Sequence, residues 1–380
     1  MMVETARNIG TSFGLDYWRA KDRDKAFPRE MWKAICDAGL CGVAIPAEYG
    51  GAGLGMLETA LVVESLVAGG AGCTLAQIFM LTPIFGGIAL SRFGTEALKK
   101  TLLPKIVSGQ MHCCMAMTEP DAGSNSLAIR TFATADGNGW LLNGRKVWIT
   151  GVDIASKMLI VARTRKLEEV RRKTDGISLF MIDTERPGVS HSAIEKLGTH
   201  TLSSSNVFFD NVRLDTEDLI GTLDGGWPQL LDVLNTERIV TVAGLVGTVD
   251  LAIRLAVAYA GERRVFDGRP IGSYQGLQFP LAQAHAESEC ARLMNYKAAW
   301  LFDNGKPYGS QANVAKLIAA QACSAATESA MQTLGGMGYA KDFHLERLWR
   351  DCRLFRFAPV SEEMTLNFIA QHDLGLPRSY

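Results

Sequence analysis

The pattern of apolar and polar positions divides the chain into three parts. Residues 1–112 carry apolar side chains at helical spacing, as in GMLETALVVESLVAGG (55–70). Between 113 and 225 the apolar runs are short, rich in β-branched residues and separated by turns, as is typical of strands. From 226 to 380 the helical spacing returns. Four segments there each predict a long helix: 228–263, 275–303, 308–335 and 344–370.

This order predicts an α+β multidomain fold. We expect an N-terminal helical domain (1–112), a middle β-domain built as a small barrel or sandwich (113–225) and a C-terminal four-helix bundle (226–380). Within the middle part, KMLIVART, ISLFMID and SNVFFDNVRL predict strands. GWLLNGRKVWITG (139–151) predicts two strands joined at Asn143 and Gly144, because Asn-Gly is a strong hairpin signal.

One uncharged stretch, SLVAGGAGCTLAQIFMLTPIFGGIALS (65–91), is long enough to be considered as a membrane span. Its glycines, its polar residues and Pro83 predict instead a buried helix–turn–helix. The first residues, MMVETARNIG, include an acid and lack the apolar centre of a secretory signal. We therefore expect no membrane span and a cytoplasmic location.

Composition narrows the function classes. Lys and Arg number 39 against 40 Asp and Glu, so the charge pattern predicts no nucleic-acid partner. The hydrophobic content of 47% suits a large helical core or extensive subunit interfaces. The cysteines form no Cys-x-x-Cys pair and have no histidines at ligand spacing, so we expect reduced, mostly buried thiols and no metal site. They are Cys36, Cys41, Cys73, Cys113, Cys114, Cys290, Cys323 and Cys352.

An acidic residue interrupts the apolar segment LLDVLNTERIVTVAGLVG (230–247). At helical spacing Glu237 shares a stripe with Leu230, Val233, Leu234, Val240, Thr241 and Gly244. A helix that is apolar on every side belongs inside a protein, so Glu237 is expected to be buried. From the residues alone it could form an ion pair, lie at a less buried helix end, or act as an acid or base.

Common catalytic signatures are absent: the chain has no Gly-x-Ser-x-Gly, no phosphate-binding Gly-rich loop with Lys, and no His-Glu-x-x-His. YGGAGLG (49–55) does not fit the dinucleotide fingerprint, and the scattered histidines are expected to be structural. AMTEPDAGSNSLA (116–128) predicts a strand edge that turns into a loop. Thr118 and Ser124 offer hydroxyls there, and Gly123 lets the backbone approach a flat ligand.

AMTEPDAGSNSLA resembles the first signature of the acyl-CoA dehydrogenase family, and other stretches resemble further family motifs in the same order along almost the whole chain. These are IPAEYGGAGLG (45–55), NGRKVWITG (143–151), FDNVRL (209–214), ERRVF (262–266), MQTLGGMGY (331–339) and RLWRDCR (347–353). Three positions in or directly after these motifs depart from the family pattern: Asn125 stands for Asp, Asp215 for Pro and Asp267 for Gly.

The resemblance implies an FAD-dependent acyl-CoA dehydrogenase with an acyl-CoA substrate, an electron-transferring flavoprotein as acceptor, and a homotetramer (dimer of dimers) or homodimer. The family removes an α-proton from an acyl thioester while a β-hydride passes to flavin N5. By similarity, one group of residues holds the flavin ring: Met117, Thr118, Gly123, Ser124, Trp148, Ile149 and Thr150. A second group reaches the FAD of a neighbouring subunit: Arg263, Phe266, Gln275, Gln332, Gly335 and Gly336.

The base is not where many family members carry it. In RFAPVSEEMT (356–365), Pro359 stands at the place of the usual glutamate, and Glu363 resembles a flavin contact. A branch that includes isovaleryl-CoA and long-chain dehydrogenases carries a Glu-Arg pair on the first helix of the bundle instead. By this likeness Glu237 is the base, and Arg238 contacts substrate or nearby backbone.

Pro359 has no N–H to donate to the thioester carbonyl, so either the loop shifts or carbonyl polarisation is weaker. The altered loop leaves two alternatives open. One is an enoyl-CoA reductase or an oxygen-using oxidase or hydroxylase on the same fold. The other is a catalytically silent flavin-binding homologue.

Overall fold

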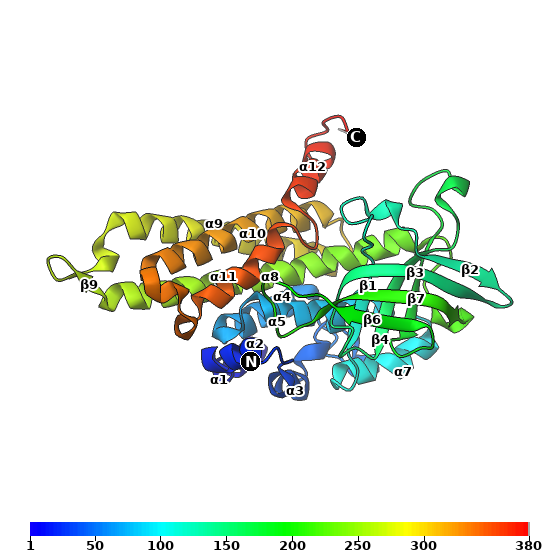
Figure 1. Cartoon of the computed structure of the whole chain (residues 1–380), viewed down its shortest axis with the longest axis horizontal. Coiled ribbons are helices and arrows are strands. Elements are labelled where there is room, and N and C mark those ends of the chain that lie inside the picture. Colours follow the sequence, from blue (N-terminus) through cyan, green and yellow to red (C-terminus); the bar gives the residue numbers. More distant parts are fainter. Residues whose placement is uncertain (379–380) are drawn as a thin grey trace.

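The computed structural model describes residues 1–378 and shows the three parts packed together (Figure 1). The long C-terminal helices form a bundle at one end, the sheet lies at the other end, and the N-terminal helices pack beneath both (Figure 1). The predicted sequence of a helical domain, a β-domain and a helical bundle is therefore confirmed.

The N-terminal part is mainly helical. It contains α1 (Met2–Ser12), α2 (Leu15–Arg23), α3 (Arg29–Asp37), α4 (Met56–Leu66), α5 (Cys73–Phe79), α6 (Ala89–Phe93) and α7 (Glu96–Val107). Two π-helical segments, Val67–Ala71 and Met80–Ile88, follow α4 and α5. The predicted helix–turn–helix of 65–91 is present, and its turn lies at Gly70 and Gly72 (φ 157° and 69°). Pro83 does not break the second helix, because it lies within the π-helical segment.

The middle part is a single twisted sheet. Its strands are β1 (Cys113–Ala116), β2 (Phe132–Asp136), β3 (Gly139–Thr150), β4 (Lys157–Arg163), β5 (Ile177–Asp183), β6 (Val189–Ala193), β7 (Ser204–Leu214) and β8 (Leu219–Ile220). The strand order is β6-β7-β3-β2-β4-β5-β8, and β1 pairs in parallel with β4. β1 begins at Cys113, and α8 of the bundle begins at Gly226.

The hairpin predicted at Asn143 and Gly144 is wrong. β3 runs straight through both residues, and the chain reverses earlier, between β2 and β3, at Gly137. The pairing of β3 with β7 shifts in register at Gly144, which has φ +149°. A Cβ atom at Gly144 would lie 2.5 Å from Oγ1 of Thr131. Glycine therefore accommodates a bulge here and not a turn.

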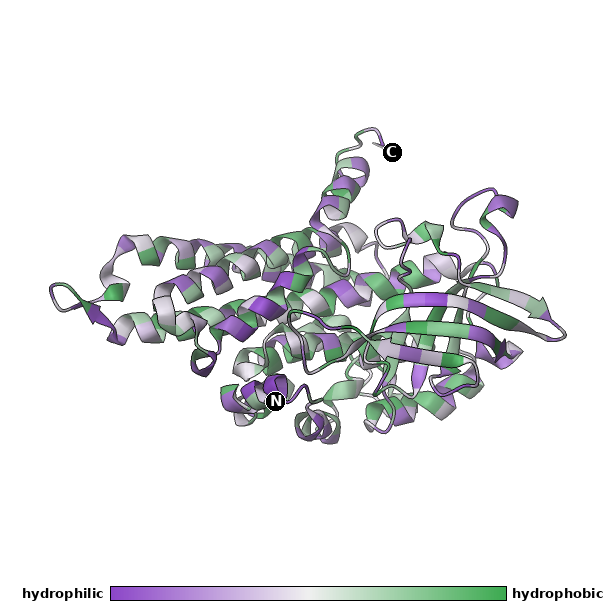
Figure 2. Ribbon diagram, viewed as in Figure 1, coloured by the Kyte–Doolittle hydropathy of each residue, from purple (hydrophilic) through white to green (hydrophobic). Residues whose placement is uncertain are grey.

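The C-terminal part consists of long helices and a small hairpin. Its elements are α8 (Gly226–Glu262), β9 (Arg264–Val265), β10 (Arg269–Pro270), α9 (Gln275–Asp303), α10 (Gly309–Leu334), α11 (Leu345–Arg353) and α12 (Glu362–His372). Bands of hydrophobic and hydrophilic residues follow one another along these helices, as expected where one side faces a core (Figure 2). α12 projects away from the rest of the chain (Figure 1).

The single helix predicted over 344–370 is wrong. α11 ends at Arg353, a 3-10 turn covers Leu354–Arg356, and α12 starts only at Glu362. Pro359 has no N–H and disfavours the helical conformation of the residue before it, so the helix cannot continue. Ser361 then caps α12, because its hydroxyl accepts a hydrogen bond from the Met364 amide at 3.2 Å.

Within residues 1–378, two helical stretches are long and apolar enough to cross a membrane, Cys73–Phe93 and Gly226–Glu262. The most apolar window of the first is 100% buried inside the protein and that of the second 78%. Core helices satisfy the same length and composition test, and this degree of burial fits core helices.

Candidate active site

Glu237 lies in the first half of α8 and is 5% exposed, so its predicted burial is confirmed. Its stripe neighbours Leu230, Val233 and Thr241 are 0% exposed. The Oε2 atom of Glu237 is buried and has no hydrogen-bond partner within residues 1–378. Burial raises the pKa of Glu237 to about 7, although Arg238 and Lys316 act to lower it. A carboxyl group with this pKa can exchange a proton near neutral pH.

Arg238 follows Glu237 and is partly buried beside it. Its guanidinium donates to Oδ1 of Asn235, one turn earlier on α8. The Nε atom is buried and has no partner within the described chain. Burial lowers the pKa of Arg238, while the neighbouring Glu237 raises it. The two side chains therefore stabilise each other's charge only in part, and Oε2 of Glu237 and Nε of Arg238 are left without hydrogen-bond partners in the described chain.

A buried ion pair anchors the strand and loop predicted to hold the flavin ring. Nζ of Lys146, on β3, lies 2.9 Å from Glu119 Oε1 and donates to the carbonyls of Met117 and Val161, both at 2.8 Å. Glu119 also accepts from the amides of Arg130 and Thr131, at 2.7 and 2.9 Å. Lys146 is 1% exposed and Glu119 7%. The pair fixes the 117–119 segment against β3.

Burial lowers the pKa of Lys146 to about 8, against the opposing effect of Glu119. Burial also raises the pKa of Glu119, but Lys146 and the two amides hold it below its usual value. The sequence pattern predicts a role for neither Lys146 nor Glu119. Lys146 carries no distinct local signal, because Arg145 beside it on β3 is also charged, and only the fold brings Glu119 to it.

Replacing Lys146 by Met is expected to destabilise the protein by about 3–5 kcal/mol and to reduce bound flavin, because Glu119 would keep a buried charge without its cation. Thermal unfolding and the flavin absorbance of the purified protein measure the two effects. Lys157→Met on β4 is the matched control. Its partner Asp183 is exposed, so its loss should cost less than about 1 kcal/mol. Equal losses in both variants would contradict the anchoring role.

The end of β3 presents the remaining flavin-ring candidates. Trp148 is 55% exposed with φ +61°, whereas Ile149 is 2% exposed and points into the β-domain core. Oγ1 of Thr150 lies 3.2 Å from the Ser204 hydroxyl on β7. A positive φ at a bulky residue is uncommon and is maintained here by the strand pairing around it.

Gly123 and Ser124 lie on an exposed loop, and a Cβ at Gly123 would meet no atom within 4 Å. Met117 and Thr118 are half-buried, and the carbonyl of Thr118 accepts from the Val147 amide at 2.9 Å. The structure therefore brings the signature loop and the end of β3 together. It leaves hydroxyl groups and an indole ring accessible on them.

The second group of predicted flavin contacts lies elsewhere. Arg263 and Phe266 follow α8, Gln275 begins α9, and Gln332, Gly335 and Gly336 lie at the end of α10. All are exposed, and Phe266 is 98% exposed on the β9–β10 hairpin. This hairpin forms the end of the bundle farthest from the sheet (Figure 1). At 1.5 Å per residue, Arg263 lies about 39 Å along the helix axis from Glu237.

The loop that carries Pro359 lies between α11 and α12. The amides of Phe357 and Ala358 both donate to the Leu354 carbonyl, at 3.1 and 3.0 Å. Glu362 is buried and pairs with Arg356, so it is not a free carboxylate. Glu363 is exposed in the first turn of α12, where the amide dipoles and the Ser361 hydroxyl lower its pKa.

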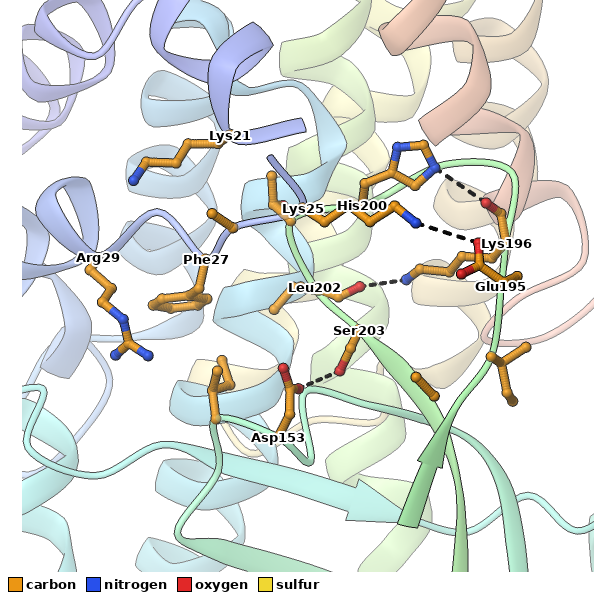
Figure 3. A pocket seen from close by; sticks show the side chains of 15 residues that line it. Lys21, Lys25, Phe27, Arg29, Asp153, Glu195, Lys196, His200, Leu202 and Ser203 are labelled. Carbon is orange, nitrogen blue, oxygen red and sulfur yellow. Dashed lines mark hydrogen bonds and ion pairs between the residues drawn. The ribbon is translucent and has the colours of Figure 1, made fainter. Parts of the chain in front are cut away.

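A separate cleft of about 430 Å³ lies between the α2–α3 turn and the loop before β7. Figure 3 shows Phe27 and Arg29 on one side, and Asp153 and Ser203 on the other. None of the predicted site residues lines it. Its cations are largely used internally: Lys196 donates to Thr199, Leu202 and Ser204.

Asp250, His285 and Glu289 lie close enough together to hold a metal ion. The guanidinium of Arg292 donates to Asp250 at 2.6 Å and also pairs with Glu289. Arg292 therefore already balances the negative charge of this cluster. All eight cysteines are free thiols, and Cys290 is the one that is exposed.

Known protein families match nearly the whole chain. Residues 1–110 match the description "Acyl-CoA dehydrogenase, N-terminal domain", residues 114–212 its middle domain and residues 224–374 its C-terminal domain. The chain is similar to acyl-CoA dehydrogenase FadE12 of Mycobacterium tuberculosis, with 42% identity over 371 residues, 97% of this chain and 94% of the relative.

Solved structures of two other proteins have the same fold as this chain. A glutaryl-coenzyme A dehydrogenase in complex with glutaryl-CoA superposes with a TM-score of 0.94 and 32% identity, covering 100% of this chain and 95% of the other. The FAD complex of PigA superposes with a TM-score of 0.92 and 26% identity, covering 99% and 97%.

Proposed function

The chain belongs to the acyl-CoA dehydrogenase family and is a flavin-dependent acyl-CoA dehydrogenase, and from this premise we propose that Glu237 is its catalytic base. In this proposal the enzyme belongs to the branch whose base lies on the first helix of the bundle. Glu237 takes the α-proton of the acyl thioester, and the product is the trans-2-enoyl-CoA.

One observation carries the proposal: a buried carboxylate with an unpartnered oxygen and a pKa of about 7. A structural ion pair would engage both oxygens, since burying a charge without partners is costly. A base needs a free lone pair and a pKa close to the working pH. The burial that raises the pKa of Glu237 therefore suits it to proton abstraction.

The residues present fit FAD. Thr118, Ser124 and Thr150 supply hydroxyls, Trp148 exposes its indole, and the space beside Gly123 is open. We propose that these residues and Met117 and Ile149 bind the flavin ring. When bound, FAD supplies the acceptor for the β-hydride.

The distal residues fit the cofactor of a second subunit. Arg263 and Phe266 lie past the C-terminal end of α8, too far from the sheet to reach the ring-binding residues of their own chain (Figure 1). Exposed apolar side chains at this end suit a subunit interface; they are Phe266 (98%), Tyr339 (83%) and Met337 (49%). We propose a homodimer or a dimer of dimers in which each FAD is held by two chains, with Gln275, Gln332, Gly335 and Gly336 in the same role.

Polarisation of the thioester carbonyl needs a donor other than residue 359. Since the Phe357 and Ala358 amides already donate to Leu354, the Val360 and Ser361 amides are the candidates within this loop. We propose that Arg238 and Ser124 contact the substrate, and that Glu363 contacts FAD. An electron-transferring flavoprotein is the proposed acceptor, and a cytoplasmic location remains our expectation.

An anaerobic titration of the purified holoenzyme with a panel of acyl-CoAs tests the function. The flavin should bleach with a saturated acyl-CoA and reoxidise slowly in air. kcat/KM should rise with pH through about 7, because the free Glu237 must lose its proton before it can accept another. Rapid reoxidation by oxygen would favour an oxidase, and no bleaching with any acyl-CoA would favour a silent homologue.

A further inference from the structure

Lys316 is a fully buried cation, distinct from the residues proposed to bind the flavin or the substrate or to take the proton. It lies on α10 and is 0% exposed. Its neighbours one turn away on α10 are Ala312, Asn313, Ala319 and Ala320, all buried and uncharged, so Lys316 is the one charged residue among them. Burying an ammonium group without compensation is strongly unfavourable. The groups that compensate the buried charge of Lys316 therefore indicate its role.

Lys316 forms a hydrogen bond with the loop that carries Pro359. Its Nζ donates to the carbonyl of Val360 at 2.5 Å, next to Pro359. This bond joins the core of the bundle to the segment between α11 and α12. Pro359 cannot donate a backbone hydrogen bond, so the loop depends more on such anchors from outside it.

The charges around Lys316 belong to the candidate site. Glu362 on α12, Arg238 and Glu237 on α8, and Arg356 before the loop are near enough for their charges to act on Lys316. Burial lowers the pKa of Lys316 to about 8, the two acids raise it, and the two arginines lower it. In return, Lys316 and Arg238 are the cations that lower the pKa of Glu237.

We propose that Lys316 is a positioning residue for proton abstraction: its ammonium holds the Val360 carbonyl, and with it the loop around Pro359, and its positive charge favours the carboxylate form of Glu237. The proposal rests on Glu237 being the base. It gives the buried lysine two separable roles, an anchor for the loop and a counter-charge for the carboxylate.

Three variants of the holoenzyme separate these roles. Gln can still donate to Val360 but has no charge, Arg keeps the charge, and Met has neither. Lys316→Gln and Lys316→Met are expected to move the rising limb of the kcat/KM pH profile upward by about one unit, which is about a tenfold loss below the midpoint. Lys316→Arg should keep the midpoint. Lys105→Met, on the exposed side of α7, is the control and should match the wild type.

The wild-type profile gives the reference midpoint for the three variants. Glu237 is already ionised above its own pKa of about 7, so loss of the Lys316 proton near pH 8 should leave kcat/KM on its plateau. The same rising midpoint in the wild type, Lys316→Gln and Lys316→Met would overturn the proposal.

Bound FAD and thermal midpoints, measured on the same samples, report any purely structural damage. Failure of the proposed base is distinguishable, because it would appear as unchanged bleaching in Glu237→Gln while Lys316 is intact.

Discussion

Glu237→Gln is expected to slow anaerobic bleaching of the flavin by an acyl-CoA by about 10²–10⁴-fold, the usual contribution of a general base. Gln has the shape of Glu but an amide that does not accept a proton at neutral pH. The side chain is buried on a packed stripe of α8, so the isosteric change should leave the fold and the bound FAD intact. Stopped-flow absorbance of the oxidised flavin measures the effect.

Glu328→Gln is the matched control. Glu328 is exposed on α10, and its oxygen accepts from the Trp349 indole at 2.7 Å, a bond that Gln can keep. It should bleach at the wild-type rate. Bleaching of Glu237→Gln at that same rate would show that Glu237 is not the base, and the carboxyl of Glu362, although paired with Arg356, would become the next candidate.

Helix positions could be predicted well because the helical period depends only on local spacing. The long segments at 228, 275 and 308 became α8, α9 and α10 within two residues at each end. The predicted hairpin at 143–144 and the predicted single helix over 344–370 were wrong because other residues outweighed the local signal for a turn or a helix. Asn143-Gly144 is a bulge because β7 and Thr131 pack against it, and 344–370 is broken because Pro359 lies inside it.

The candidate site could be predicted only in part. The apolar stripe around Glu237 was sufficient to place its carboxyl in the core, because every position one turn away is apolar or small. Lys146 and Lys316 were missed, since each is stabilised by atoms from segments distant in sequence, Glu119 in one case and Val360 in the other. Periodicity cannot show such pairs. The structure was also needed to show that Arg263, at the far end of the bundle, and Trp148, on the sheet, lie far apart.

That placement leads to a test of shared sites. Arg263→Ala alone should lose FAD, and Glu237→Gln alone should keep FAD but lose activity. When the two chains are mixed and reassembled, one site of each heterodimer combines an intact Glu237 with an intact Arg263 from the other chain. Random pairing of subunits in a symmetric dimer should then restore about a quarter of the wild-type activity.

The control mixes Glu237→Gln with Lys146→Met. Both changes affect the same half of the site, because Lys146 anchors the 117–119 segment of its own chain. A heterodimer then has one site without the base and one without a firm flavin strand, so no activity should return. Recovery in this control, or none in the Arg263 mixture, would mean that Arg263 does not act across a subunit boundary. Since about 39 Å of α8 separates Arg263 from Glu237 within one chain, recovery only with Arg263→Ala requires a partner subunit.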